Sequence, residues 1–183
     1  LDEYVFRDVC NKQMEWKRKG LGVIPVSINL SRASLYFESV VKQYHSIASE
    51  TGVDTELVPI EITESAAIDN ENIKALADRF HSNGFPLMVD DFGAGYSSLA
   101  TLNMKCFDTL KIDKSLIDYI GDFSGEKLLE HTIALAKDLG LNVTAEGVET
   151  EEQVDFLRKI NCDSIQGYYY SKPLPEQEFK KLL

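Results

Sequence analysis

The chain has 183 residues, of which 44% are hydrophobic, so it is long enough to form a globular domain with a sizeable core. Its 19 lysine and arginine residues are outnumbered by 30 aspartate and glutamate residues, and the net charge of −11 excludes duplex DNA or RNA as an expected partner. No stretch reaches the roughly 20 apolar residues of a membrane span, and none resembles a signal peptide. Cys10, Cys106 and Cys162 form no CxxC pair. We therefore expect a soluble, cytoplasmic segment without membrane contact of its own, although a longer parent protein could be anchored.

Short β-branched runs alternate along the chain with segments of helical period. The first helix is expected at 3–20, and Gly20, Gly52 and Gly84 each follow a helical stretch and precede a strand. No linker or shift in composition interrupts the pattern, so one domain over 1–183 is expected. The predicted strands are 23–30, 57–63, 86–92, 108–113, 141–147 and 164–170.

Two later helices have sequence signals of their own. Thr150 can cap a helix over 150–160, and Gln153 is placed to complete a capping box. The segment 126–140 is expected to be a helix that ends at Gly140. Its expected apolar stripe consists of Leu128, Leu129, Ile133, Ala136 and Leu139.

Repeated strand–helix units predict a parallel sheet, either open and doubly wound or closed as a barrel. A polar residue follows the apolar part of every strand, and a barrel gathers all strand ends at one mouth, whereas an open sheet gathers ligand groups at one switch point. This pattern favours a TIM-like (β/α)8 barrel. Since such barrels have eight strands in about 250 residues, the chain is expected to lack the first two strands. The polar residues are Asn29, Glu61, Asp90, Lys111, Glu146 and Gln166.

The stretch PLMVDDFGAGYSSL, residues 86–99, places two aspartates side by side at the end of a strand. Adjacent strand residues face opposite sides, so Asp91 is expected to be redirected by the glycine-containing loop that follows. Each aspartate alone is typical of a turn or a helix cap. Together with the other carboxylates, the amide and the lysine, the pair indicates an oxygen-rich site suited to Mg²⁺ or Mn²⁺.

Two motif matches in this stretch are weak. DFG at 91–93 is found in protein kinases, but no kinase catalytic loop or glycine-rich phosphate loop accompanies it. GAGYSS half-matches the dinucleotide-binding fingerprint, but Ser98 stands at its third glycine. His45, His81 and His131 all fall in helical stretches, where a structural role is the simpler expectation.

Six motifs carry a resemblance to a known family: SINLS, IEITES, VDDFGAGYSSL, LKIDKSL, TAEGVETEEQ and IQGYYYSKPLP. In this order and spacing they are similar to the EAL domain family of cyclic di-GMP phosphodiesterases. The resemblance implies an eight-stranded barrel, a site for two Mg²⁺ or Mn²⁺ ions, and hydrolysis of cyclic di-GMP to linear pGpG. It also implies that the Glu-Ala-Leu strand and a nearby arginine would precede residue 1, so 1–183 is expected to be an N-terminally truncated domain.

The resemblance also assigns roles to residues. Lys111 would position the attacking water, Glu146 would be a metal ligand or base, and Glu64 would brace the loop after Asp91. Substrate contacts are expected from Glu149 and Pro173. Ala94 departs from the threonine that is more common in the family. The metal ligands would be Asn29, Glu61, Asp90, Asp91, Glu146 and Gln166.

Two metal ions also suit the chemistry, because they can hold the phosphate oxygens, generate hydroxide and stabilise the leaving oxygen. The first hypothesis is therefore a bacterial signalling phosphodiesterase, in which the truncated chain is weak or inactive. The alternative is a module that binds cyclic di-GMP without cleaving it, and a third hypothesis is an interaction scaffold. A homodimer is expected, and the chain as given is expected to self-associate through unpaired strand edges.

Overall fold

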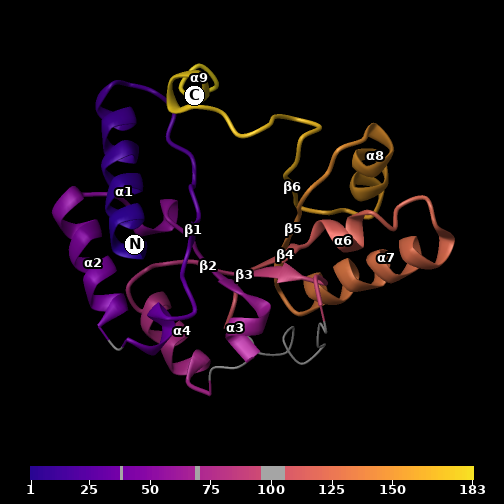
Figure 1. The fold of residues 1–183 in the computed structure, drawn as a ribbon, viewed down its shortest axis with the longest axis horizontal. Helices are drawn as coiled ribbons and strands as arrows, with labels where there is room; N and C mark the ends of the chain where they lie inside the picture. Colours follow the sequence, from indigo (N-terminus) through magenta and orange to yellow (C-terminus); the bar gives the residue numbers. More distant parts are fainter. Residues whose placement is uncertain (38, 69–70, 96–105) are drawn as a thin grey trace. The chain divides into compact units, whose positions relative to one another are not determined.

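The computed structural model describes residues 1–37, 39–68, 71–95 and 106–183, in which strands and helices alternate (Figure 1). These residues form two compact units. The first consists of Leu1–Ile62, Ala66–Leu87 and Leu174–Leu183, and the second of Thr63–Ser65 and Met88–Pro173. Within the described ranges, no helix is long and apolar enough to cross a membrane.

The first unit is built on two helices that lie side by side, α1 (Asp2–Arg18) and α2 (Val40–Thr51). The ring of Phe6 stacks on that of Tyr44 with centroids 4.0 Å apart, and Phe85 meets Phe6 edge-on at 5.8 Å. All three side chains are fully buried, so this aromatic cluster forms the centre of the unit's core. The other elements wholly or partly in this unit are β1 (Ile28–Asn29), η1 (Ser34–Tyr36), η2 (Thr55–Leu57), β2 (Ile60–Thr63), α3 (Glu64–Ile68), α4 (Ile73–His81) and α9 (Glu176–Phe179).

β1 and β2 pair in parallel over a short ladder in which Asn29 lies opposite Glu61. The buried side chain of Gln13, on α1, donates from Nε2 to the carbonyl of Ile24 at 2.8 Å and to the carbonyl of Leu57 at 3.0 Å. These carbonyls belong to the segments that lead into β1 and β2. One amide group of α1 therefore ties together the entries of both strands.

The second unit carries four strands that pair in parallel and in chain order, β3 with β4, β4 with β5 and β5 with β6. In the described part of the chain, every strand lies within a range predicted from the sequence and is no longer than that range. The predicted α/β class of alternating strands and helices is confirmed. The elements are β3 (Leu87–Phe92), β4 (Thr109–Ile112), α6 (Lys114–Ile117), α7 (Phe123–Asp138), β5 (Asn142–Ala145), α8 (Glu151–Lys159) and β6 (Ser164–Ile165).

Helix α7 begins three residues before the predicted start. The side chain of Asp122 caps it by accepting a hydrogen bond from the backbone N–H of Gly125 at 2.8 Å. The helix buries Leu129 and Ile133 but leaves Leu128 53% exposed, so the predicted stripe was wrong at that position. The reason is that the buried face starts at Gly125, which shares a face with residues four and eight positions later.

Helix α8 has the predicted capping box. The Thr150 hydroxyl accepts from the backbone N–H of Gln153 at 3.2 Å, and the Gln153 side chain accepts from the backbone N–H of Thr150 at 3.1 Å. The predicted strand at 164–170 ends early, because the chain turns at Gly167 and the backbone N–H of Tyr170 donates to the Gly167 carbonyl at 3.1 Å.

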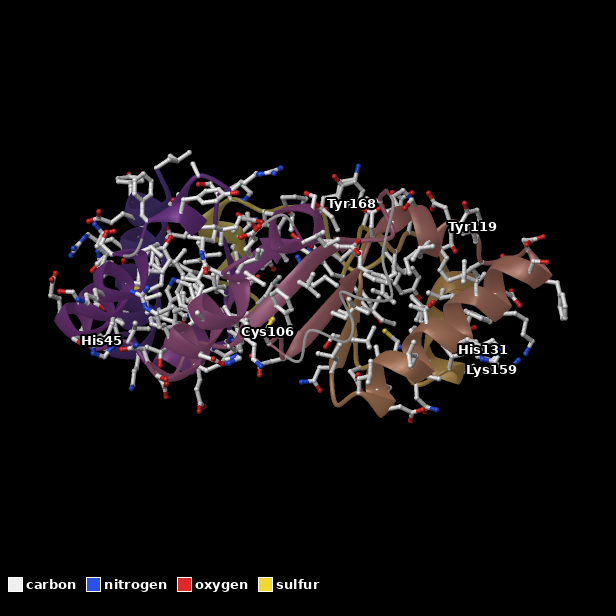
Figure 2. The ribbon with its side chains drawn as sticks, turned by 90° about the horizontal axis from the view of Figure 1, so that it is seen from below. His45, Cys106, Tyr119, His131, Lys159 and Tyr168 are labelled. Atoms are coloured by element: carbon white, nitrogen blue, oxygen red, sulfur yellow. The ribbon has the colours of Figure 1, made fainter. Side chains whose placement is uncertain are left out.

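The three histidines lie on helices, as predicted. His45 is on α2 and His131 on α7, both labelled in Figure 2, and His81 is the last residue of α4. The second unit's strands end instead in the carboxylates and the lysine that the sequence singled out. Those residues form the site.

Candidate functional site

Asp90, Lys111 and Glu146 come together at the carboxyl ends of β3, β4 and β5. Lys111 Nζ lies 3.0 Å from Asp90 Oδ1 and 2.9 Å from Glu146 Oε1. The side chains of Asp90, Lys111 and Glu146 are only 11%, 7% and 17% exposed, respectively. Three consecutive parallel strands thus deliver one lysine between two carboxylates, and with both carboxylates ionised the cluster carries a net charge of −1.

The environment of Glu146 makes its carboxyl group unusually basic. Burial raises the pKa of Glu146 to about 7, and the nearby carboxylate of Asp90 raises it as well. The ion pair with Lys111 lowers the pKa but does not cancel the effect of burial. Glu146 can therefore exchange a proton near neutral pH, as a general base or acid requires.

Asp91 has a left-handed backbone conformation, with φ of +59°. The register of β3 against β4 shifts between Val89 and Phe92, and the backbone N–H of Asp91 donates to Asp90 Oδ1 at 2.9 Å. The change in backbone direction that was expected from the loop glycines therefore begins before them, at Asp91 itself. Aspartate is one of the few side chains that tolerate this conformation. Residues 96–99, the end of the quoted motif, lie outside the described residues.

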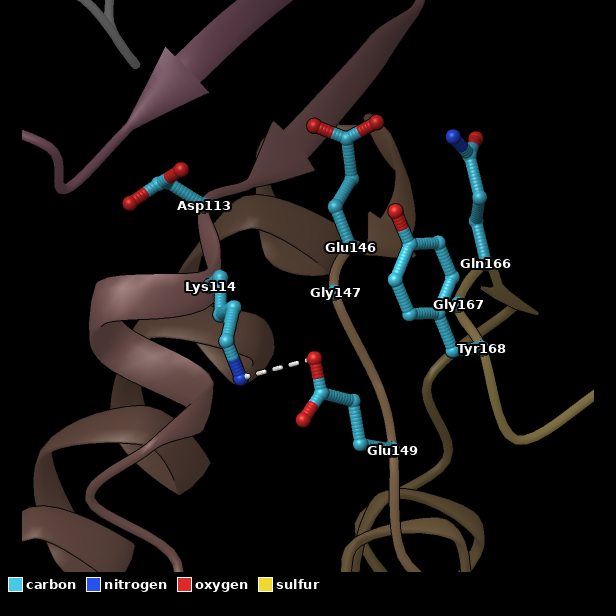
Figure 3. Close-up of a pocket in the computed structure, with 8 residues that line it drawn as sticks. All are labelled: Asp113, Lys114, Glu146, Gly147, Glu149, Gln166, Gly167 and Tyr168. Atoms are coloured by element: carbon cyan, nitrogen blue, oxygen red, sulfur yellow. Dashed lines mark ion pairs between the residues drawn. The ribbon is translucent and has the colours of Figure 1, made fainter. Parts of the chain in front are cut away.

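A pocket of about 340 Å³ opens beside Glu146 (Figure 3). The side chains of Glu146, Gln166 and Tyr168 run in one direction, whereas Glu149 turns toward Lys114, whose Nζ lies 3.4 Å from Glu149 Oε1. Carboxylates, an amide and an aromatic ring at one opening suit a polar, ring-containing ligand. The lining residues are Asp113, Lys114, Glu146, Gly147, Glu149, Gln166, Gly167 and Tyr168.

The other predicted site residues are placed as follows. Asn29 and Glu61 face each other across the β1–β2 register in the first unit, with Asn29 exposed and Glu61 5% exposed. Glu64 opens α3 and is 6% exposed. Pro173 is exposed and does not line the pocket beside Glu146.

Five residues that line the pocket were not among the predicted site residues: Asp113, Lys114, Gly147, Gly167 and Tyr168. All five lie within motifs quoted from the sequence, LKIDKSL, TAEGVETEEQ and IQGYYYSKPLP. The available signal was position: polar residues in the turn just after a strand line the same mouth as the strand end.

Within the described ranges, no group of three or more His, Cys, Asp or Glu side chains is positioned to hold a metal ion. The donor chemistry nevertheless suits a hard divalent cation, because Asp90 and Glu146 offer only oxygen atoms and converge on one positive charge. In the first unit, the register pairs a further amide with a further carboxylate, Asn29 with Glu61.

Comparison with known proteins gives a consistent result. The family model described as the EAL domain matches residues 1–173. The cyclic di-GMP phosphodiesterase NbdA of Pseudomonas aeruginosa is 35% identical over 100% of this chain and 24% of its own length. The oxygen sensor protein DosP of Escherichia coli is 35% identical over 97% of this chain and 22% of its own length. The chain thus spans about a quarter of these relatives.

The solved structures agree with the sequence comparisons. The EAL domain of Mycobacterium smegmatis DcpA has a TM-score of 0.91 and 35% identity, covering 100% of this chain and 83% of that one. The PaMucR phosphodiesterase in complex with cyclic di-GMP has a TM-score of 0.88 and 28% identity over 97% of this chain and 72% of that one. These EAL domains are TIM-like barrels, and the parallel strands of this chain correspond to part of such a barrel. The chain belongs to the EAL domain family.

Proposed function

We propose that this chain forms the catalytic region of a phosphodiesterase that hydrolyses cyclic di-GMP to linear pGpG. The observation that carries the proposal is the buried Asp90–Lys111–Glu146 cluster within an EAL fold. NbdA is named as a cyclic di-GMP phosphodiesterase, and PaMucR was solved with cyclic di-GMP. Related structures of Klebsiella pneumoniae BlrP1 contain cyclic di-GMP with calcium or with manganese.

The carboxylates fit a divalent-metal site, for which Mg²⁺ and Mn²⁺ are the proposed ions. In the second unit, Asp90, Asp91 and Glu146 are the proposed metal ligands. In the first unit, taken by itself, Asn29 and Glu61 are the proposed metal ligands. Gln166 would be a further oxygen ligand at the rim. When bound, two divalent cations supply a hydroxide at neutral pH and neutralise charge on the phosphate oxygens.

The chain's own residues contribute positioning and proton transfer. Lys111 holds the Asp90 and Glu146 carboxylates in a fixed geometry, and its charge offsets the negative charge that develops during attack on the phosphate. Glu146 is the proposed acceptor of the proton of the attacking water, because its carboxylate is held by Lys111 and lines the adjoining pocket. The adjoining pocket, which Glu149 and Tyr168 line, would hold the substrate beside Glu146.

The test is pGpG release from cyclic di-GMP in Mn²⁺ by the complete domain to which this chain belongs. The Asp90→Asn variant should lose at least about a hundredfold in kcat, which corresponds to about 2.7 kcal/mol of transition-state stabilisation. The matched control is Asp138→Asn, an exposed aspartate at the end of α7, which should leave turnover unchanged. A wild-type complete domain that binds Mn²⁺ and releases no pGpG contradicts the proposal.

The same experiment separates an enzyme from a sensor module. Binding of cyclic di-GMP is measured in Ca²⁺ and turnover in Mn²⁺ on one preparation. Tight binding without turnover would show that the domain is a non-catalytic receptor for cyclic di-GMP rather than a phosphodiesterase. Turnover that Asp90→Asn abolishes, with binding retained, would establish the enzyme.

A further inference from the structure

Two glycines near proposed metal ligands pack against the same short helix, α6: Gly147 directly follows Glu146, and Gly93 lies two residues after Asp91. Gly93 has a φ of +101° and Gly147 a φ of +66°. A Cβ at Gly93 would lie 2.3 Å from Leu116 Cδ1, and a Cβ at Gly147 would lie 2.5 Å from Lys114 Cβ. The first turn of α6 therefore occupies the space that side chains in both loops would need.

Hydrogen bonds fix the loop after β3 to this turn. The Ser115 hydroxyl donates to the Gly93 carbonyl at 3.1 Å. Just before it, the backbone N–H of Asp113 donates to the Phe92 carbonyl at 2.9 Å. The loop itself is closed by the backbone N–H of Ala94, which donates to the Asp91 carbonyl at 3.1 Å. The left-handed Asp91 is thus held within a turn that is attached to α6.

The loop after β5 meets α6 through Lys114. The methylene groups of Lys114 pack against Gly147, and its Nζ lies 2.8 Å from Asp118 Oδ1. The same Nζ lies 3.4 Å from Glu149 Oε1 (Figure 3). These ion pairs are about half exposed, so their electrostatic contribution is small and the packing against Gly147 matters more.

Helix α6 is well anchored for such a role. Asp113 caps it by accepting a hydrogen bond from the backbone N–H of Ser115 at 2.9 Å, and Ile117 is fully buried. A short helix with a fixed start and a buried anchor is a rigid support for two loops that have irregular backbone.

We propose that Lys114, Ser115 and Leu116 are positioning residues: the first turn of α6 sets the geometry of the Asp91 loop and the Glu146 loop together. The effect on turnover rests on the proposed phosphodiesterase function, whereas the effect on the loops does not. Ser115 and Leu116 do not line the pocket beside Glu146, whereas Lys114 does. Loss of the Ser115 or Leu116 side chain should therefore lower kcat by misplacing Asp91 and Glu146, with little change in KM.

The first test compares Ser115→Ala with Ser115→Thr. Loss of the hydroxyl should lower kcat about fivefold, in line with one lost hydrogen bond, and should leave KM within about twofold. Threonine keeps the hydroxyl and should restore kcat. The control, Ser124→Ala, removes an exposed hydroxyl from the start of α7 and should change nothing.

The second test is a double-mutant cycle. Gly93→Ala should lower kcat at least about twentyfold, because the methyl group collides with Leu116 and φ is unfavourable for alanine. Leu116→Ala removes the colliding side chain, so the double variant should be several-fold faster than Gly93→Ala alone. A double variant slower than Gly93→Ala would overturn the steric part of the proposal.

Hydrogen exchange decides the positioning role independently of activity. The amides of Asp91 and Ala94 are hydrogen-bonded within the loop and should exchange at least about tenfold faster in Ser115→Ala and Leu116→Ala, at unchanged thermal midpoint. Unchanged exchange overturns the positioning role, even if turnover falls. If the two variants exchange faster but the wild-type protein releases no pGpG, the positioning role is upheld and only the proposed phosphodiesterase activity is overturned.

Discussion

Replacing Lys111 by methionine removes the only positive charge that the described contacts place between Asp90 and Glu146, while keeping the volume of the side chain. All three side chains are less than a fifth exposed, so the two carboxylates would face each other in a buried site. Breaking a buried ion pair of this kind costs about 3–5 kcal/mol, and we expect the lower end, about 3 kcal/mol, at pH 8 without metal. For a chain of this size, that lowers Tm by about 6–12 °C.

The cost should depend on pH with a defined sign. The pKa of Glu146 is raised in the folded state, so the stabilising contribution of its protonated form is complete below the ordinary value of 4.5 and is lost as pH rises through about 7. The positive charge of Lys111 lowers this pKa, so the pKa of Glu146 is higher still in the variant. The variant should therefore lose more stability than the wild type as pH rises. At pH 5 Glu146 is protonated in the variant and repulsion is relieved, which leaves about 1 kcal/mol for the lost hydrogen bonds.

The assay is urea unfolding at pH 5 and pH 8 in a chelating buffer, followed by a titration with Mn²⁺. The control is Lys127→Met, an exposed lysine paired with Glu130 on α7, which should change stability by less than about 0.5 kcal/mol at either pH. The double variant Lys111→Met with Glu146→Gln should recover most of the loss at pH 8. A Lys111→Met deficit that is the same at pH 5 and pH 8 would refute the argument from buried charge.

Three further outcomes are expected. Thr150→Ala breaks the capping box of α8 and should cost about 1 kcal/mol, seen as a Tm lower by about 2–4 °C. Gly147→Ala should abolish pGpG release, because the new methyl group would collide with Lys114 Cβ, an atom that a change of side-chain rotamer does not move. Retained activity would show that the loop can adapt. Hydrogen bonds from Lys19 and Lys180 lower the pKa of Glu15 to about 2. The wild-type protein should therefore be more stable than Glu15→Gln above pH 4.5, and this difference in stability should vanish as pH falls toward 2. Unfolding followed by circular dichroism measures it.

The sequence predicted the order and type of the elements, because hydrophobic period and caps are local signals. The capping box at Thr150 and the strand around Asp90 were found in this way. The sequence predicted the ends of the strands less accurately. The tyrosine run at 168–170 favours a strand by composition, but Gly167 packs against the backbone of Val148, and the chain turns there.

The candidate site was predictable in part. Alternation along parallel strands indicated that Asp90, Lys111 and Glu146 would meet, and their distances follow from the strand pairing. The backbone conformation of Asp91 could not be read from the sequence, because it depends on a register shift between two strands. Nor could the role of Lys114, which depends on how α6 packs beside a glycine.

The Gln13 side chain has a further consequence for the way this family member can change. A slip of one residue in a parallel pair would turn every side chain of β1 to the opposite face, and the backbone N–H groups of Val26, Ile28 and Leu30 oppose it by donating to the carbonyls of Leu57, Pro59 and Glu61. By binding the carbonyls of Ile24 and Leu57, the Gln13 side chain supports the same register from α1. Part of what aligns Asn29 with Glu61 therefore lies outside both strands, so a substitution at Gln13 would move these two side chains without contacting them.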